Sequence, residues 1–305
     1  MKMQDCLDVV VHRLLLSCVA LVPSGVFHVR LALPSISRAW VAAILVVTIG
    51  ASTATAQTVV SWGVVTNPPP SLGPTIAVAA GTAHSLALQA DSALAAWGSS
   101  PCGQTNVPDG LENVVAIAAG EDHSLALKSD GSLVAWGCET PWDLTRVPAG
   151  ATNVTQIAAG RRHSLALRSD GTVLGWGDNG EGECDPPEDL RAVAVATGGR
   201  FSLALRKNGT VAAWGGNFFG QCRPPPGLGD VVAVAAGDNH ALALRADGTV
   251  IGWGDNSCGQ CDVPPDLSAV SAISAGASYC LALRADGTVA AWGQAAAMQP
   301  PPDLA

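Results

Sequence analysis

The chain has 305 residues, of which 48% are hydrophobic, 13% charged and 5% aromatic, and it contains 34 Gly and 20 Pro. This apolar share excludes a disordered chain, and so much Gly and Pro favours short strands and tight turns over helices. The net charge is −9, and it is −11 once residues 1–56 are set aside. An acidic surface repels phosphate backbones, so we do not expect nucleic acid as a partner.

Residues 1–56 have the features of a signal peptide with a long N-terminal region. Arg38 precedes the apolar run Ala39–Gly50, and small residues then end in Ala54-Thr55-Ala56. The run is shorter than the roughly 20 apolar residues that cross a bilayer. We therefore expect cleavage after Ala56, no membrane attachment afterwards, and a secreted or extracytoplasmic protein in the periplasm or on the cell surface.

Residues 57–305 form a second domain, a continuous array of repeats. The segment AAGxxHSLAL occurs six times with small variations, its glycine recurs every 38 to 40 residues, and each copy ends in Trp-Gly. A seventh Trp-Gly precedes the first copy. A period of this length indicates repetition of one supersecondary unit. The repeated tryptophans are Trp62, Trp97, Trp136, Trp176, Trp214, Trp253 and Trp292.

One unit, Val114–Gly137, illustrates the predicted structure. We expect strands at Val114–Ala118, His123–Lys128 and Ser132–Trp136, with a hairpin turn at Asp130-Gly131. The loop after Trp-Gly has room for a short fourth strand. The first copy has Asp91-Ser92 in place of Asp-Gly, which predicts a looser turn. Three or four antiparallel strands per unit predict an all-β fold, a β-propeller with one blade per repeat.

The repeated Trp and His side chains are expected to be structural. Because the Trp residues recur in register, we interpret them as wedges between blades. One His starts the second strand of most units, but Phe201 and Tyr279 replace it in two, and Phe cannot bind a metal. We therefore expect hydrogen bonds between blades, with no metal and no cofactor; the histidines are His84, His123, His163 and His240.

The pattern AAGxxHSLALxxDGxVxAWG resembles the repeat of the regulator of chromosome condensation family across residues 58–305. The resemblance implies a seven-bladed propeller. Compact bacterial members of that family, among them secreted beta-lactamase inhibitors, open on a lone strand ending in Trp-Gly, as Thr58–Gly63 does here. After Trp292-Gly293 only a loop follows, which predicts six complete blades plus a partial seventh made of the N-terminal strand alone.

The loops between strands carry the candidate binding residues, because propellers bind through loops at one end of the axis. The loop inside GxxH varies most between copies, and it supplies a basic cluster in adjacent units. The loops after Trp-Gly add large aromatics. The alternatives are ordinary surface variation for the arginines and side chains folded onto the blade edge for the aromatics. The candidate contact residues are Arg161, Arg162, Arg200, Trp142, Phe218 and Phe219.

Two further motifs are interpreted as structural. The acidic loop Asp178–Asp189 lacks the complete calcium-loop signature, so we expect a solvated loop. Seven cysteines follow residue 56, including a C-x-x-C that has no second pair suited to zinc. An odd number leaves at least one unpaired within the chain, and the alternatives are a local disulfide, a disulfide across blades, or free thiols. They are Cys102, Cys138, Cys184, Cys222, Cys258, Cys261 and Cys280.

The sequence contains no nucleophile elbow, phosphate-binding loop or repeated carboxylate pair, so we expect no enzyme. The predicted function is non-enzymatic binding of an unknown protein or surface polymer through the blade loops. One alternative is an inhibitor of a secreted enzyme, although the GxxH loops lack the aromatics that the resemblance to lactamase inhibitors implies. The other is an enzyme with a site at the axial end of the propeller, which needs polar residues around the axis.

Overall fold

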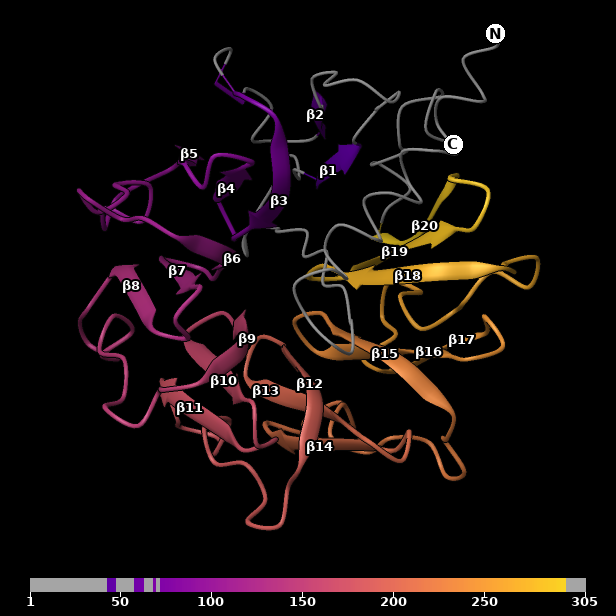
Figure 1. The fold of residues 1–305 in the computed structure, drawn as a ribbon. Coiled ribbons are helices and arrows are strands. Elements are labelled where there is room, and N and C mark those ends of the chain that lie inside the picture. Colours follow the sequence, from indigo (N-terminus) through magenta and orange to yellow (C-terminus); the bar gives the residue numbers. More distant parts are fainter. Residues whose placement is uncertain (1–42, 48–57, 63–67, 70–71, 295–305) are drawn as a thin grey trace, which may run out of the picture.

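The computed structural model describes residues 43–47, 58–62, 68–69 and 72–294. Six three-stranded antiparallel sheets follow one another around a common centre, as in a β-propeller (Figure 1). We number these sheets as blades 1 to 6 in chain order. No helix in the described part of the chain is long and apolar enough to span a membrane.

Each blade runs from an inner strand near the axis to a middle strand and then to an outer strand. The inner strands are β3 (Thr75–Ala80), β6 (Val114–Ala119), β9 (Val154–Ala159), β12 (Ala192–Thr197), β15 (Val231–Ala236) and β18 (Val270–Ala275). The middle strands are β4 (His84–Gln89), β7 (His123–Lys128), β10 (His163–Arg168), β13 (Phe201–Arg206), β16 (His240–Arg245) and β19 (Tyr279–Arg284). The outer strands are β5 (Leu94–Gly98), β8 (Leu133–Gly137), β11 (Val173–Gly177), β14 (Val211–Gly215), β17 (Val250–Gly254) and β20 (Val289–Gly293).

The prediction of six complete blades plus a partial seventh is confirmed, but the partial sheet differs in one respect. β2 (Thr58–Trp62) is not alone, because it pairs in antiparallel fashion with β1 (Ala43–Val47). The pair lies between β3 of blade 1 and β20 of blade 6 (Figure 1). The segment AILVV of β1 lies within the apolar run assigned to the signal peptide. Its β-branched residues suit a strand as well as a signal segment. The cleavage after Ala56 stays a prediction.

The middle–outer hairpins of blades 2 to 6 have the expected Asp-Gly or Asn-Gly turns, and the first copy has the same turn geometry. In blade 2 Lys128 N donates to Ser132 O, and Gly131 N donates to Lys128 O. The equivalent donors in blade 1 are Gln89 N and Ser92 N. The prediction of a looser turn was therefore wrong. Ser92 adopts the left-handed conformation that glycine takes elsewhere, with φ of 68°.

Middle strands have both faces buried, and the alternation in H-S-L-A-L makes these faces unlike. His and the two Leu point towards the following blade, while Ser and Ala point towards the preceding one. In the seam between blades 3 and 4, Leu165 and Leu167 pack with Ala204 and Trp214 of the next blade. Large groups on one blade thus fit small groups on the next, which gives a close-packed core without large voids.

The repeated Trp side chains lie in these seams. The indole N–H donates to a backbone carbonyl in the loop that follows the preceding blade, at a distance of 2.9–3.1 Å. Five indoles share this arrangement: Trp136, Trp176, Trp214, Trp253 and Trp292. Trp97 is also buried, but its N–H has no acceptor within the described residues. Trp62 ends β2, and its side chain lies outside the described part.

The histidines also bridge seams. His84, His123 and His163 contact the Ser hydroxyls of the next blade, with Nε2–Oγ distances of 2.8–3.0 Å. Ser202, the partner of His163, donates its only proton to the Glu183 carbonyl, so the imidazole Nε2 must be the donor. His240 makes the equivalent contact to the Cys280 thiol, at 3.1 Å.

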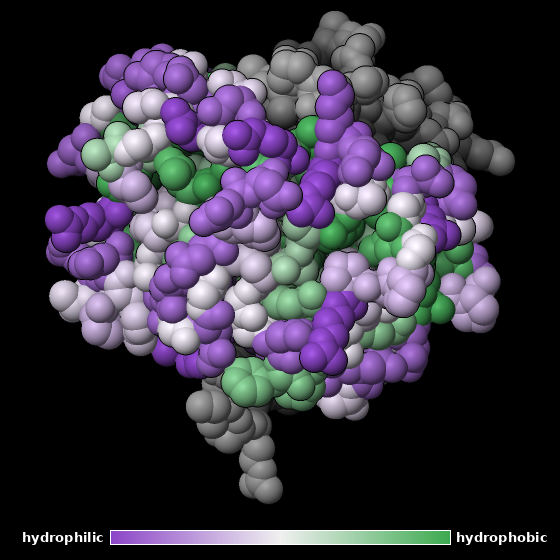
Figure 2. All heavy atoms as spheres, turned by 90° about the horizontal axis from the view of Figure 1, so that it is seen from below, coloured by the Kyte–Doolittle hydropathy of each residue, from purple (hydrophilic) through white to green (hydrophobic). Residues whose placement is uncertain are grey.

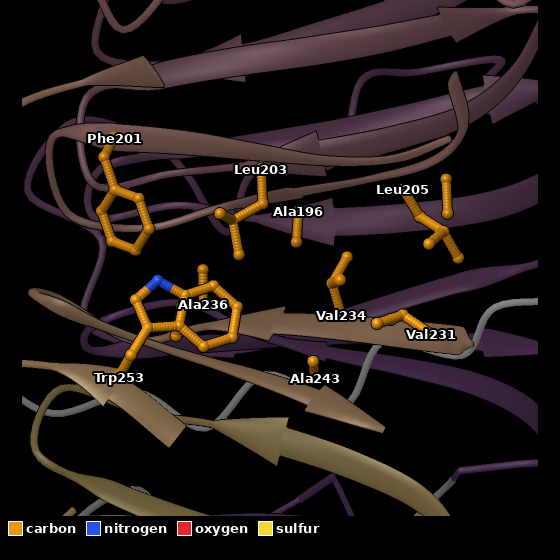
Figure 3. Packing of buried hydrophobic residues seen from close by; sticks show 11 residues of the cluster. Ala196, Phe201, Leu203, Leu205, Val231, Val234, Ala236, Ala243 and Trp253 are labelled. Carbon is orange, nitrogen blue, oxygen red and sulfur yellow. The ribbon is translucent and has the colours of Figure 1, made fainter. Parts of the chain in front are cut away.

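The seam between blades 4 and 5 is apolar at this position. Phe201 replaces the histidine, and Ala241 stands in the next blade where the serine is expected. Both are fully buried, and the Phe201 ring points towards Trp253 (Figure 3). Donor and acceptor have been replaced together, which leaves no buried polar atom unpaired at this point.

Candidate binding surface

The variable GxxH loops and the starts of the loops after Trp-Gly meet at one end of the ring, which we call the GxxH end. Backbone hydrogen bonds join them: Cys138 N to Asp122 O at 2.9 Å, Asp178 N to Arg162 O at 2.7 Å, and Gly216 N to Arg200 O at 2.8 Å. These bonds fix the loop backbones, so side chains at this end project from a rigid frame.

Hydrogen bonds between blades also connect successive GxxH loops. Thr82 N donates to Gly120 O, and Glu121 N donates to Arg161 O, each at 3.1 Å. At Gly120 an added Cβ would lie 2.2 Å from Cε1 of His123 and 2.6 Å from the Gly160 carbonyl oxygen. Glycine is needed here because the histidine ring and the next blade both approach the backbone closely.

The arginine pair of blade 3 shares one carboxylate, from a residue that the sequence did not single out. Arg161 and Arg162 each donate from Nε to Glu121 of blade 2, at 3.0 and 3.1 Å. The Arg162 guanidinium also stacks on Trp142, 4.0 Å from the ring centroid. These four residues form one cluster across the seam between blades 2 and 3. The ion pairs could have been predicted from the sequence, because the GxxH loop of the preceding blade contains a Glu.

Arg200 belongs to a different seam. Its guanidinium lies 3.9 Å from Glu181, and its side chain is 55% exposed. By their contacts, the six candidate residues fall into two groups. Trp142, Arg161 and Arg162 lie together at blades 2 and 3, whereas Arg200, Phe218 and Phe219 belong to blade 4, where Gly216 N bonds Arg200 O at the start of the aromatic loop.

Phe218 and Phe219 project from a tight turn after β14. Asn217 O accepts from Gly220 N, Asn217 Oδ1 accepts from Cys222 N, and Gln221 Oε1 accepts from Phe219 N. The rings are 78% and 52% exposed. Figure 2 shows the edge of the ring from below, where apolar patches lie among a mainly polar surface. Large aromatics held this far out on a fixed turn are typical of contact residues rather than of folded-back side chains.

Among the described residues, the cysteines supply one disulfide and several protonated thiols. Cys102 of the loop after blade 1 is bonded to Cys138 at the end of blade 2, so this disulfide crosses a seam. Burial raises the pKa of Cys184 to about 12 and that of Cys261 to about 11, and both thiols donate to backbone carbonyls at 3.2 Å. Such thiols are poor nucleophiles and poor metal ligands.

The acidic loop is held by its own hydrogen bonds. Asn179 donates from Nδ2 to Asp185 at 2.9 Å, and Glu183 accepts from the backbone of Glu181. Burial raises the pKa of Glu183. No group of three or more His, Cys, Asp or Glu within the described residues is placed to hold a metal ion.

The inner strands line a central cavity of about 70 Å³. Its lining is apolar apart from Thr197, and the rest is contributed by Ala, Val and Ile side chains of successive blades. A lone hydroxyl among aliphatic groups offers neither an acid–base pair nor an activated nucleophile.

A ring of three-stranded blades with exposed variable loops defines a repeat β-propeller. Four of its blades match the family model for the regulator of chromosome condensation (RCC1) repeat, at residues 114–140, 154–183, 192–221 and 231–260. These four segments are repeats of the RCC1 type. A comparison with curated protein sequences gave no match.

Solved structures share the fold at low sequence identity. Yeast RCC1 (Prp20) bound to Kap60 aligns with a TM-score of 0.61 and 23% identity over 73% of this chain and 70% of that chain. Prp20p from Saccharomyces cerevisiae, described with its binding to Gsp1p and histones, gives 0.59 and 23% over 72% of each. The ectodomain of the Arabidopsis thaliana receptor kinase ACR4 gives 0.63 and 22% over 77% of this chain and 88% of that chain. This likeness establishes the fold.

Proposed function

We propose that the protein is a secreted, non-enzymatic propeller that binds a protein or surface polymer through its blade loops. The observation that carries the proposal is the contrast within each repeat. The strands are nearly identical and mostly buried or half-buried, while the loops differ and hold the exposed Phe218 and Phe219. Similar propellers support it, since yeast RCC1 (Prp20) is described bound to Kap60.

The described residues that line the axis include no acid–base groups, which favours binding over catalysis there. Export is supported by the signal-like segment Ala39–Gly50 and by the Cys102–Cys138 disulfide, because disulfides persist in oxidising compartments. N-terminal sequencing of protein recovered outside the cytoplasm should begin at Gln57. Protein that stays in the cytoplasm with Met1 intact would contradict export.

Binding is tested by recovery of partners from the envelope and medium of the producing cell with tagged full-length protein. Quantitative mass spectrometry should find proteins or polymers enriched by the wild type and lost with F218S/F219S. The matched control is V232S, which removes an exposed apolar side chain from a strand instead of a loop. Equal recovery with F218S/F219S and the wild type, or no enrichment at all, would refute the proposal.

A further inference from the structure

The distribution of charge singles out blade 4. Residues 191–229 contain five of the 16 basic residues of the chain and none of its 25 acidic residues. Each of the other five complete blades carries at least one Asp or Glu, and the protein as a whole is acidic. The basic residues are Arg191, Arg200, Arg206, Lys207 and Arg223.

These charges are poorly compensated within the described residues. Arg161 and Arg162 in blade 3 share Glu121 at hydrogen-bond distance, but in blade 4 only Arg200 has a carboxylate within 4 Å, and that contact is 3.9 Å long. Arg223 is exposed and forms no ion pair with a described residue. An arginine left without a carboxylate is available to a carboxylate on another molecule.

The same blade carries the exposed aromatic pair. The turn that presents Phe218 and Phe219 continues directly to Arg223, whose N–H bonds the Gly220 carbonyl at 2.9 Å. The turn begins where Gly216 N bonds Arg200 O. The turn with the two rings is therefore bonded at its start to the backbone of Arg200 and ends at Arg223. We call these four residues the blade 4 edge: Arg200, Phe218, Phe219 and Arg223.

Equivalent turns in other blades lack this combination. In blades 1, 3 and 5 the positions of Phe218 and Phe219 hold no aromatic residue; they are Pro101 and Cys102, Gly180 and Glu181, and Ser257 and Cys258. Blade 2 has one aromatic there, in Pro141 and Trp142, and its GxxH loop has Asp122 where blade 4 has Arg200. Because the turns of blades 1, 3 and 5 keep the same backbone hydrogen bond without these rings, folding of the turn does not require the aromatics.

We infer that the blade 4 edge docks an acidic protein segment that also carries apolar side chains. This inference rests on the proposed binding function and names the chemistry of the partner. Carboxylates pair with Arg200 and Arg223, while apolar groups cover the two rings, in the pattern of aromatic and arginine hot spots. The −11 charge of residues 57–305 repels a polyphosphate or another strongly anionic polymer but leaves a local basic edge for a short acidic peptide.

The experiment measures fluorescence anisotropy of short labelled peptides with the full-length protein. One peptide combines Asp and Glu with Leu and Phe, a second replaces Leu and Phe by Ser, and a third replaces Asp and Glu by Lys. The first should bind most tightly and weaken as salt is added. R200E/R223E and F218S/F219S should each lower the affinity for the first peptide by roughly tenfold or more. The controls R146E and V232S should leave it unchanged.

Several results would overturn the inference. One is that the first peptide does not bind, and another is that the Lys peptide binds as tightly as the first. The inference also fails if a DNA oligonucleotide displaces the first peptide as well as unlabelled peptide does, or if the protein self-associates and R200E/R223E abolishes this. If envelope partners are still recovered by R200E/R223E but the peptide does not bind, the proposed function stands and this inference fails. If no partner is recovered by the wild type, the proposed function itself fails.

Discussion

The seam between blades 3 and 4 and the seam between blades 4 and 5 solve one packing problem in two ways. The first buries His163 against Ser202, and the Ser202 hydroxyl donates a hydrogen bond to the Glu183 carbonyl. The second buries Phe201 against Ala241 with no polar atom at either position. Around both, the Leu face, the Ala face and the indole are the same. The difference teaches that the two positions change as a pair, because a lone donor or acceptor buried there would cost about 1–3 kcal/mol.

The largest loss of stability is expected from removing the buried indole, which both seams contain. W214A and W253A should each lower the free energy of unfolding by about 3–5 kcal/mol, because a buried indole is removed and a carbonyl loses its donor. Urea denaturation measures the loss. W142A, which removes a half-exposed loop indole, is the control and should cost far less. Tolerance of W214A would mean that the indole is not the wedge that the seam requires.

Acid should distinguish a histidine seam from an apolar one. Burial lowers the pKa of His84 and of His240 from 6.5 to about 4. Between these pH values the unfolded chain binds more protons than the folded protein does. The free energy of unfolding therefore falls as the pH drops from about 6.5 to about 4, by about 3 kcal/mol for each imidazole. H240F/C280A copies the seam between blades 4 and 5. It should show a shallower loss between pH 7 and pH 4.5 in urea denaturation; an unchanged loss would contradict the assignment.

Exchange of one seam type for the other tests the pairing directly. F201H alone should destabilise the protein by about 2 kcal/mol, because the new imidazole faces Ala241 and lacks an acceptor. F201H/A241S restores the acceptor and should recover at least half of that loss. A double-mutant cycle by urea denaturation, with F201L as the size control, gives the coupling. Zero coupling would show that the two replacements coincide by accident.

The smallest effect lies outside the seams. Ser92 has a φ of 68°, where a residue with a Cβ is disfavoured by about 1 kcal/mol. S92G should therefore raise the melting temperature slightly, and G131S in the equivalent turn of blade 2 should lower it. Opposite signs of the two shifts in a thermal melt support the shared turn geometry. A destabilising S92G would contradict it.

Much of the fold could be predicted from the sequence because the signals are local. The alternation in H-S-L-A-L, the Asp-Gly turns and the terminal Trp-Gly placed the strands of Val114–Gly137 within about one residue of their observed ends. The hairpin partner of Thr58–Trp62 was missed because AILVV reads equally well as a signal segment or as a strand. The turn at Ser92 was misjudged because its Asp91 carboxylate still accepts from the Ala93 backbone.

The candidate site was harder to predict, since its contacts cross from one repeat to the next. The choice of Glu121 as the partner of both Arg161 and Arg162, and the bond between Cys102 and Cys138, depend on how adjacent blades are rotated. An alignment of the repeats shows that Phe201 stands at a His position and Ala241 at a Ser position. These replacements acquire meaning only when the serine of one blade is known to meet the histidine of the blade before it.

Because every blade has one large-residue face and one small-residue face, the ring has a direction. A duplicated repeat inserted between two others would find a matching surface on both sides, so such an array can lengthen or shorten by whole units without redesign of its interior. Blades 4 and 5 are the exception, since Phe201 needs Ala241 behind it. If such units are duplicated or lost during evolution, blades 4 and 5 are expected to be duplicated or lost as a pair.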